Sequence, residues 1–254
     1  MKGSKKEMTK RLEGKVAIVT GAARGIGRAY CLAMAREGAH IVAVDLLETA
    51  PTKSAVERFG VKALALKADV SLEEDTLRMA QETIAAFGRI DILISNAAIS
   101  PEQPLDEITF ADWRKVLSVD LDGVFLCAKA VIPQMKKQKS GRIINIASST
   151  VFMSFPNLTH YITAKAGVIG MTRALATELG DYGILVNAIS PGLTQTERTV
   201  TVPDEIWAMQ VAMQSVKRRE VPEDLVGTAV FLASDEAAFI TGQTLSVCGG
   251  FVKR

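Results

Sequence analysis

Seven short apolar runs, separated by longer amphipathic segments, limit what this chain can fold into. The runs occupy residues 15–20, 40–45, 62–70, 91–96, 142–148, 184–190 and 243–248. Most are continuously apolar rather than alternating, which is typical of strands buried on both faces. This alternation of strand and helix predicts an α/β fold: a mostly parallel, doubly wound, seven-stranded sheet with helices on both faces.

The amphipathic segments mark the expected helices. Helices are expected to begin near Ile26, Leu72, Phe110, His160 and Glu223. Two of these starts carry a capping-box pattern, in which a hydroxyl residue is followed three positions later by an acid. The pairs are Ser71 with Glu74 and Thr109 with Asp112.

No internal repeat, low-complexity segment or linker divides the chain, so we expect one domain over residues 12–254 after a flexible basic tail over residues 1–11. The net charge of +2 favours neither nucleic acid nor an anionic membrane, and no run approaches the roughly 20 apolar residues that span a bilayer. Three isolated cysteines and two histidines argue against a metal site and a disulfide framework. The expected compartment is the reducing cytoplasm.

Residues 194–218 form a segment that is longer than a plain strand-to-helix connection needs. It is either a lid or a disordered excursion. Its aromatic and methionine side chains favour the first interpretation, a lid that covers a binding site. These side chains are Trp207, Met209 and Met213.

The first expected strand runs directly into "TGAARGIGRAY", which places Gly21, Gly25 and Gly27 in the turn before a helix. Glycines there let the backbone approach a pyrophosphate, and the helix N-terminus offers free N–H groups and a positive dipole. Glycines also serve ordinary turns. The position after the first strand, with an acid at the end of the second strand, favours a dinucleotide site.

That acid is Asp45, 24 residues after Gly21 (45 − 21). Its carboxylate can accept hydrogen bonds from the adenosine ribose hydroxyls and would repel a 2′-phosphate, by roughly 4 kcal/mol at 4 Å and an effective dielectric near 20. The next residue, Leu46, supplies no cation. Arg24 points the other way, because a guanidinium in the glycine turn could pair with a 2′-phosphate. The balance favours NAD over NADP.

Several motifs recur in a fixed order along the chain. They are "TGAARGIG" (20–27), "ADV" (68–70), "SNAA" (95–98), Ser148, "YITAK" (161–165) and "PGLTQT" (191–196). In this order and spacing the chain resembles the short-chain dehydrogenase/reductase family from Leu12 to Gly250, and within it the bacterial NAD-dependent dehydrogenases of the 1-phenylethanol type. The resemblance implies a single-domain Rossmann fold, an oxidoreductase and a homotetramer.

The spacing of Tyr161 and Lys165 suits acid–base chemistry at a carbinol carbon. Hydride transfer from an alcohol needs a base for the hydroxyl proton, and an unperturbed tyrosine, with a pKa near 10, is too weakly ionised at neutral pH. Lys165, one helical turn away, brings a positive charge that favours tyrosinate. The resemblance adds that Lys165 holds the nicotinamide ribose and that Ser148, 13 residues before Tyr161 (161 − 148), hydrogen-bonds the substrate oxygen.

The resemblance also distributes the cofactor contacts along the chain. Asp69 and Val70 would flank the adenine, the 96–98 segment would line the path of the ribose chain, and the 191–196 segment would meet the nicotinamide carboxamide. The candidate cofactor set is Gly21, Arg24, Gly25, Ile26, Gly27, Asp45, Leu46, Asp69, Val70, Asn96, Ala97, Ala98, Tyr161, Lys165, Pro191, Gly192, Thr194 and Thr196.

Three positions depart from the family pattern. Asp120, in "VDLDGVF", stands where the family usually has an asparagine that completes the catalytic set and feeds a proton relay. An aspartate can accept from a water but lacks the amide donor, so our hypothesis is that Asp120 still orders the relay with an altered pH–rate profile. Ser95 in "SNAA" and Cys248 near the C-terminus are milder changes, the second of which bears on subunit assembly.

The expected substrate pocket is apolar. The eleven residues after Ser148 carry no charge. Such walls favour an uncharged secondary alcohol or ketone, aryl-alkyl or alicyclic. The candidate substrate-binding residues are Ser148, Phe155, Tyr161, Ile99, Trp207 and Met213. His160, beside the tyrosine, points elsewhere on the helix and is interpreted as packing or a polar lip of the pocket.

Two other functions stay open. An NADP-dependent 3-oxoacyl-carrier-protein reductase shares the fold and the Ser-Tyr-Lys set, and Lys129 and Arg173 could meet its acidic carrier, whereas Asp45 argues against it. A non-catalytic NAD-binding regulator is supported only by Asp120.

Overall fold

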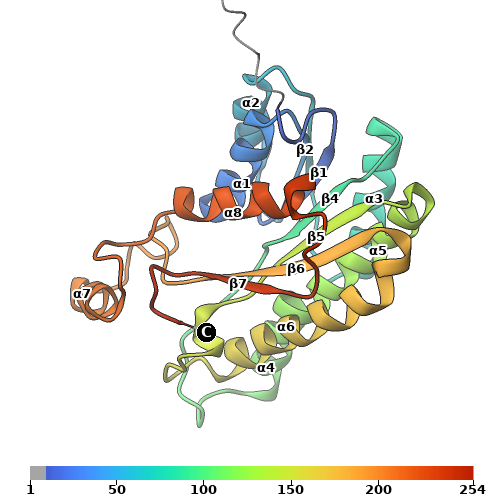
Figure 1. Ribbon diagram of the computed structural model, residues 1–254. Coiled ribbons are helices and arrows are strands. Elements are labelled where there is room, and N and C mark those ends of the chain that lie inside the picture. The colour runs from blue at the N-terminus through green and yellow to red at the C-terminus, as the bar shows by residue number, and fades with distance from the viewer. Residues whose placement is uncertain (1–9, 254) are drawn as a thin grey trace, which may run out of the picture.

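The computed structural model describes residues 10–253, and these form one parallel seven-stranded sheet with helices on both faces (Figure 1). The strand order is β3-β2-β1-β4-β5-β6-β7, and every neighbouring pair is parallel. The strands are β1 (Val16–Thr20), β2 (His40–Asp45), β3 (Ala63–Lys67), β4 (Ile92–Ser95), β5 (Gly141–Ile146), β6 (Ile184–Pro191) and β7 (Thr244–Val247). All seven predicted strands are confirmed.

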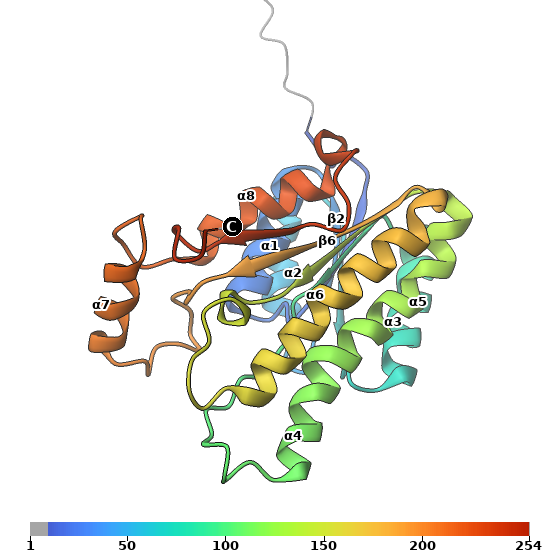
Figure 2. The ribbon, with the colours of Figure 1, turned by 60° about the horizontal axis from the view of Figure 1, so that its bottom comes forward.

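Helices α1, α2 and α8 cover one face of the sheet, and α3, α5 and α6 cover the other (Figure 2). The α-helices are α1 (Gly25–Arg36), α2 (Ala50–Glu57), α3 (Glu73–Phe87), α4 (Phe110–Leu117), α5 (Gly123–Gln138), α6 (Thr159–Leu179), α7 (Asp204–Met213) and α8 (Pro222–Ala233). The five predicted starts fall within one residue of the starts of α1, α3, α4, α6 and α8, while no separate starts were predicted for α2, α5 and α7.

The central strands divide their side chains between two cores. Ala17 and Val19 of β1 pack into the core under α1 and α8, whereas Val16 and Ile18 pack into the core under α3, α5 and α6. Successive residues of a strand point to opposite faces, so a strand covered on both sides must be apolar throughout. This explains why the runs in the sequence do not alternate.

The strand order reverses between β1 and β4. From β1 the chain continues outward to β2 and β3, and from β4 it continues in the opposite direction to β5, β6 and β7. In open α/β sheets a crevice opens outside the carboxyl ends of the strands at this point. The turn with Gly21, the end of β2 with Asp45 and the loop after β5 with Ser148 all lie at this edge.

Of the two predicted capping boxes, one is confirmed and one is wrong. Thr109 caps α4, with its hydroxyl accepting from the Asp112 N–H and the Asp112 side chain accepting from the Thr109 N–H. At α3 the N-cap is Leu72. Ser71 instead donates both its N–H and its hydroxyl to the Asp69 carboxylate, so the Ser71 N–H is not available to the Glu74 side chain.

The segment with Asp120 is a π-helical turn, Ser118–Asp122, between α4 and α5. The three pieces form one continuous helical path from Phe110 to Gln138. A single π turn inside an α-helix is frequently found at functional sites, because the extra residue redirects a side chain.

Residues 1–9 of the expected flexible tail lie outside the described part of the chain. Arg11, at the end of that expected tail, is held by an ion pair with Glu37 at 2.7 Å. Within residues 10–253 no helix is long and apolar enough to cross a membrane.

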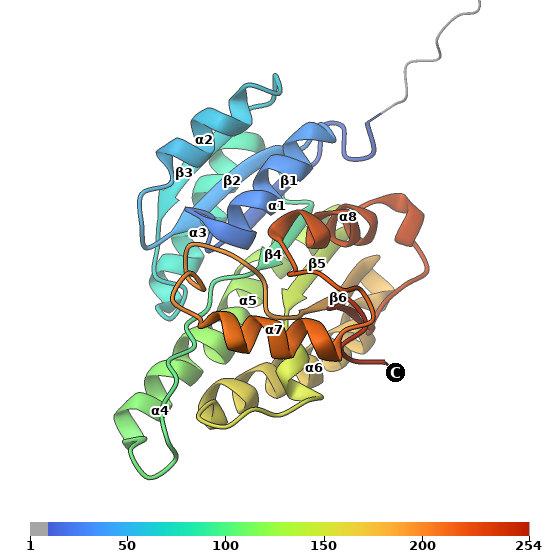
Figure 3. The ribbon, with the colours of Figure 1, turned by 90° about the vertical axis from the view of Figure 1, so that its left-hand side faces the viewer.

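The segment over residues 194–218 contains a helix, α7, which stands off the sheet on the side of the carboxyl strand ends (Figures 1 and 3). The segment therefore contains regular secondary structure, and its role as a lid stays a prediction.

Candidate active site

A cavity of about 960 Å³ opens at the carboxyl ends of the strands and under the lid segment. Every residue of the candidate cofactor set lines it. The candidate catalytic residues Ser148, Tyr161 and Lys165 line it as well. The structure therefore brings together, around one cavity, residues that lie up to 175 positions apart in the chain (196 − 21).

The glycine turn is shaped for a ligand that approaches the backbone. Gly21 and Gly25 have φ of +67° and +55°, which L-residues with a side chain rarely adopt. A Cβ on Gly27 would lie 2.0 Å from the Gly21 carbonyl oxygen. The Asn96 side-chain amide donates to the carbonyls of Thr20 (2.9 Å) and Gly21 (3.3 Å). Asn96, predicted to line the cofactor path, therefore also holds the glycine turn in place.

Asp45 is held at the cavity wall by two backbone groups. Its Oδ2 accepts from the Ala23 N–H and its Oδ1 from the Leu47 N–H, both at 3.0 Å. Each carboxylate oxygen has a second lone pair, so Asp45 can still accept from a diol in the cavity. The open glycine turn at a helix N-terminus and a fixed carboxylate at the end of β2 fit a dinucleotide. Arg24, exposed in the same turn, makes no ion pair with the described residues.

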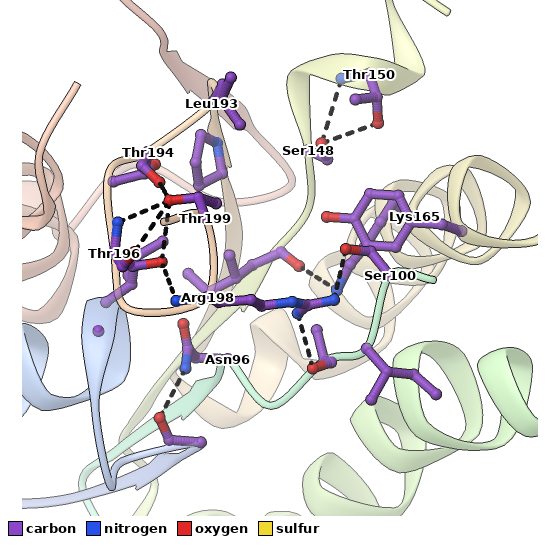
Figure 4. Close-up of a pocket in the computed structure, with 18 of the residues that line it drawn as sticks. Asn96, Ser100, Ser148, Thr150, Lys165, Leu193, Thr194, Thr196, Arg198 and Thr199 are labelled. Carbon is purple, nitrogen blue, oxygen red and sulfur yellow. Dashed lines mark hydrogen bonds between the residues drawn. The ribbon is translucent and has the colours of Figure 1, made fainter. Parts of the chain in front are cut away.

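Ser148 is oriented by a residue that the sequence analysis missed. Its Oγ accepts from both the backbone N–H (3.3 Å) and the hydroxyl (2.9 Å) of Thr150 (Figure 4). The Ser148 hydroxyl therefore keeps its own proton for a different acceptor. Because Ser148 lines the cavity, that proton can be donated to an oxygen bound there.

Lys165 is almost fully buried, and its ammonium has two fixed partners. Nζ donates to the Ile146 carbonyl at 3.1 Å and lies 3.2 Å from Asp120 Oδ2. It also lies 5.6 Å from the centroid of the Tyr161 ring, which places a cation beside the phenol. An ammonium has three donors, so one N–H remains for a ligand in the cavity.

Asp120 has no exposed surface and lies behind the cavity wall rather than in it. Its Oδ1 accepts from the Ile99 N–H at 2.8 Å, and its Oδ2 faces Lys165. Burial raises the pKa of Asp120 above its ordinary value, while the charge of Lys165, the Ile99 hydrogen bond and the more remote charge of Arg198 oppose that rise. When ionised, Asp120 offsets the charge that Lys165 presents to Tyr161.

For the alcohol oxidation that the sequence analysis expects, Asp120→Asn should move the acid limb of the pH profile to lower pH, by about one pH unit. Without the carboxylate, the Lys165 ammonium favours the ionised base more strongly. The measurement is kcat/KM against pH for the wild type and the variant. Thermal unfolding checks that the variant is folded, since breaking a buried ion pair is costly. An unchanged profile would contradict both this prediction and the relay hypothesis.

The substrate side of the cavity differs from the prediction at the lid. Ile99 and Phe155 line the cavity as expected, but Trp207 and Met213 do not. Trp207 is 3% exposed and packs away from the cavity, with the Arg219 guanidinium 4.9 Å from its ring centroid. Met213 lies outside the cavity at the end of α7, with 45% of its surface exposed.

Three other residues of α7 line the cavity: Ile206, Met209 and Gln210. Their spacing of three and four residues puts them on one helical face, from which Trp207 is turned by about 100°. His160 is fully buried and does not line the cavity, so the packing interpretation holds and the polar-lip interpretation is wrong.

Arg198, which the sequence analysis did not single out, reaches across the cavity from the lid segment (Figure 4). Its guanidinium donates to the Ala98 carbonyl (3.1 Å) and to the Ser100 hydroxyl. It forms no ion pair with the described residues. The only signal in the sequence was a lone arginine two residues after Thr196, and a single surface charge does not stand out.

Comparison with known proteins agrees with this geometry. A family model described as enoyl-(acyl carrier protein) reductase matches residues 21–252. The chain is 40% identical over 242 residues to the (2S)-[(R)-hydroxy(phenyl)methyl]succinyl-CoA dehydrogenase subunit BbsD of Thauera aromatica, which covers 94% of this chain and 97% of that protein. It is 42% identical over 246 residues to a 3-oxoacyl-[acyl-carrier-protein] reductase of Synechocystis sp., which covers 95% and 98%.

A solved structure shares both the fold and much of the sequence. A protein described as an NAD(P)-dependent gluconate 5-dehydrogenase from Beutenbergia cavernae, with NADP bound at low occupancy, superposes with a TM-score of 0.91 at 39% identity over 96% of this chain and 98% of that chain. The sheet order, the glycine turn and the common location of Ser148, Tyr161 and Lys165 agree with these matches. The chain belongs to the short-chain dehydrogenase/reductase family of oxidoreductases.

Proposed function

We propose that this oxidoreductase transfers a hydride between NAD(H) and an apolar secondary alcohol or its ketone, of aryl-alkyl or alicyclic type. The observation that carries the proposal is the pair of hydrogen bonds that Thr150 makes to Ser148 Oγ at the cavity wall. The Ser148 hydroxyl accepts twice from Thr150 and is left to donate into a cavity that Tyr161 and Lys165 also line. That arrangement suits a single oxygen that is a hydroxyl in one state and a carbonyl in the other.

The chain's own residues supply the proton chemistry. Ser148 holds the substrate oxygen through its O–H, and Tyr161 removes the hydroxyl proton in oxidation or returns it in reduction. Lys165 favours the ionised phenol and has one N–H left for the nicotinamide ribose. NAD, when bound along the candidate cofactor set, supplies the two-electron hydride acceptor. The proposal for these three residues is supported by their common place at the cavity and by the Lys165 ammonium beside the Tyr161 ring.

The walls beyond the catalytic residues favour an apolar substituent. Phe155, Ile206 and Met209 are among the apolar residues that line the cavity. The name of the Thauera relative describes a secondary alcohol on a carbon that carries a phenyl group, which supports an aryl substrate here. Arg198 favours a different substituent, because a guanidinium that has hydrogen bonds but no ion pair among the described residues can bind an anionic group on the substrate.

A 3-oxoacyl-carrier-protein reductase is the second candidate, because the Synechocystis relative bears that name. Arg173 is exposed and makes no ion pair with the described residues, so it could meet an acidic carrier. Lys129 is less suited, since its ammonium is paired with Glu73 at 2.7 Å. The fixed carboxylate of Asp45 favours NAD, and the NADP-bound neighbour shows that this fold also accommodates NADP.

A substrate and cofactor panel should separate these candidates. Initial rates of nicotinamide reduction are measured with aryl-alkyl and alicyclic secondary alcohols, each alongside a hydroxy acid of matched size, with NAD and NADP in parallel. The expected result is turnover of the apolar alcohols with at least a tenfold preference for NAD in kcat/KM. Preference for NADP with turnover of 3-oxoacyl thioesters would favour the reductase. Cofactor binding without turnover of any substrate would support a non-catalytic regulator.

A homotetramer remains part of the proposal. Leu105, Phe110 and Phe125, in and before the α4–α5 path, are exposed by 71%, 78% and 48% of their surface. Large apolar side chains exposed along this part of the chain would be covered if another copy packed there.

A further inference from the structure

Glu220 is a buried carboxylate behind the part of the cavity wall that follows β6. It lies just before α8 and is 5% exposed. It contacts a loop 26 residues earlier in the chain (220 − 194). Buried carboxylates are rare unless they are paired or hydrogen-bonded. The partners of Glu220 therefore indicate what it does.

Both carboxylate oxygens bind the loop that carries Gly192 and Thr194. Oε1 accepts from the Thr194 hydroxyl at 2.8 Å. Oε2 accepts at 3.2 Å from the Gly192 N–H, which also donates to the Val247 carbonyl at 3.2 Å. The Glu220 carbonyl also accepts from the Gln195 N–H at 2.8 Å. Gly192 and Thr194 line the cavity while Glu220 does not, so the carboxylate acts on the wall from behind.

The contact with Thr194 decides which hydrogen bonds that residue can offer to a ligand. A hydroxyl has one proton and two lone pairs. With its proton given to Glu220, the Thr194 hydroxyl is left with acceptor capacity only, which suits the NH₂ donor of a carboxamide bound along this loop. The nicotinamide ring carries such a carboxamide, and the 191–196 segment is the part of the candidate cofactor set assigned to it.

We propose that Glu220 is a positioning residue for the nicotinamide end of the cofactor site, fixing Thr194 as a hydrogen-bond acceptor and holding Gly192 in the cavity wall. This inference rests on the proposed NAD(H)-dependent function. It assigns no contact between Glu220 and the reacting atoms.

The surroundings of Glu220 make its charge sensitive to pH near neutrality. Burial raises its pKa to about 7, with the Thr194 and Gly192 hydrogen bonds opposing that rise. Asp224 raises the pKa further and Arg218 lowers it, and these two side chains pair with each other.

Two more titratable groups face the same place from other elements. The Tyr30 hydroxyl of α1 is buried without a hydrogen-bond partner, and the charge of Glu220 adds to the burial that raises the Tyr30 pKa. Cys248 packs against Gly192: a Cβ added to Gly192 would lie 3.2 Å from the Cys248 Cβ. Below pH 7 a protonated Glu220 becomes a donor and competes with the Thr194 proton.

The test compares two ligands that differ in the nicotinamide. Dissociation constants for NADH and for ADP-ribose are measured by calorimetry with the wild type, Glu220→Gln and Glu223→Gln. The glutamine at 220 keeps the shape but has only one acceptor oxygen for two donors. NADH should bind about tenfold more weakly to Glu220→Gln, while ADP-ribose binding stays within twofold. Glu223, an exposed acid three residues away, is the matched control, and its variant should bind both ligands normally.

A second variant keeps the inference falsifiable if Glu220→Gln folds poorly. Thr194→Val removes the hydroxyl and should also weaken NADH binding without affecting ADP-ribose. The two substitutions together should weaken NADH binding less than the product of the single effects, because they remove one shared contact. Independent effects that multiply would overturn the inference.

The pH dependence gives a further readout. In the wild type NADH binding should weaken as pH falls from 8 to 6, and in Glu220→Gln it should stay flat over that range. Equal weakening of NADH and ADP-ribose in Glu220→Gln, or no weakening of either, would overturn the positioning role. A wild type that binds neither ligand would instead overturn the proposed function on which the inference rests.

Discussion

Tyr161→Phe should lower kcat for alcohol oxidation by about 10²–10⁴-fold, the range that a positioned general acid–base group contributes. Phenylalanine keeps the ring beside Lys165 but removes the only group that we assign to the substrate proton. Binding of NADH should change little, because the phenylalanine keeps the ring of this candidate cofactor residue, and Lys165 and the glycine turn are intact. Steady-state kinetics and NADH titration of the same preparation check both statements.

Tyr182→Phe is the control for this variant. Tyr182 is 41% exposed, lies outside the cavity, and has the Lys136 ammonium 4.2 Å from its ring centroid. Its substitution removes a phenol from the surface and should leave kcat unchanged. If Tyr161→Phe kept more than a tenth of wild-type kcat, the proton would have to travel by another group, and the assignment of Tyr161 would be wrong.

The strands and the glycine turn were predictable because their signals are local. A strand covered on both faces must be largely apolar, and β1 meets that requirement with five buried residues in a row, of which all but Thr20 are apolar. The glycines of the turn are required by backbone angles and by close approach, as the 2.0 Å contact at Gly27 shows. Such constraints act within a few residues and so are visible in one sequence.

The sequence indicated that the segment over residues 194–218 lies at the cavity, but not which of its side chains line it. Composition indicated that the aromatic and sulfur-containing side chains of α7 would face the substrate, yet Trp207 turns away and Ile206 lines the cavity. Which face of a short helix is covered depends on its neighbours, and here Arg219, twelve residues later, packs over the indole. No local pattern specifies that contact.

Glu220 and Thr150 were missed for different reasons. Glu220 meets Thr194 only because the chain returns to the cavity after α7, a path that residue types do not reveal. Thr150 is close to Ser148 in sequence, but a threonine two residues after a serine is ordinary, and its role depends on the loop geometry after β5. Both residues act by orienting a neighbour, a role that leaves little trace in a single sequence.

Asp45→Asn combined with Leu46→Arg should reverse the cofactor preference. The first change removes a carboxylate charge worth roughly 4 kcal/mol against a 2′-phosphate at 4 Å, which corresponds to a factor on the order of 10³ in relative kcat/KM. Asparagine keeps an oxygen that can accept from the Ala23 or the Leu47 N–H, so the turn should hold its shape. Leu46 is 55% exposed, so an arginine there costs little packing and supplies a cation for the phosphate.

The ratio of kcat/KM with NAD to kcat/KM with NADP is the quantity to measure, in the wild type, in each single variant and in the double variant. Glu74→Gln is the control, because it removes one exposed carboxylate outside the cavity and should leave the ratio unchanged. High salt should weaken the new preference for NADP, since the Leu46→Arg cation would be screened by ions. A wild type that already prefers NADP, or a double variant whose ratio moves less than threefold, would mean that Arg24 rather than Asp45 sets the cofactor choice.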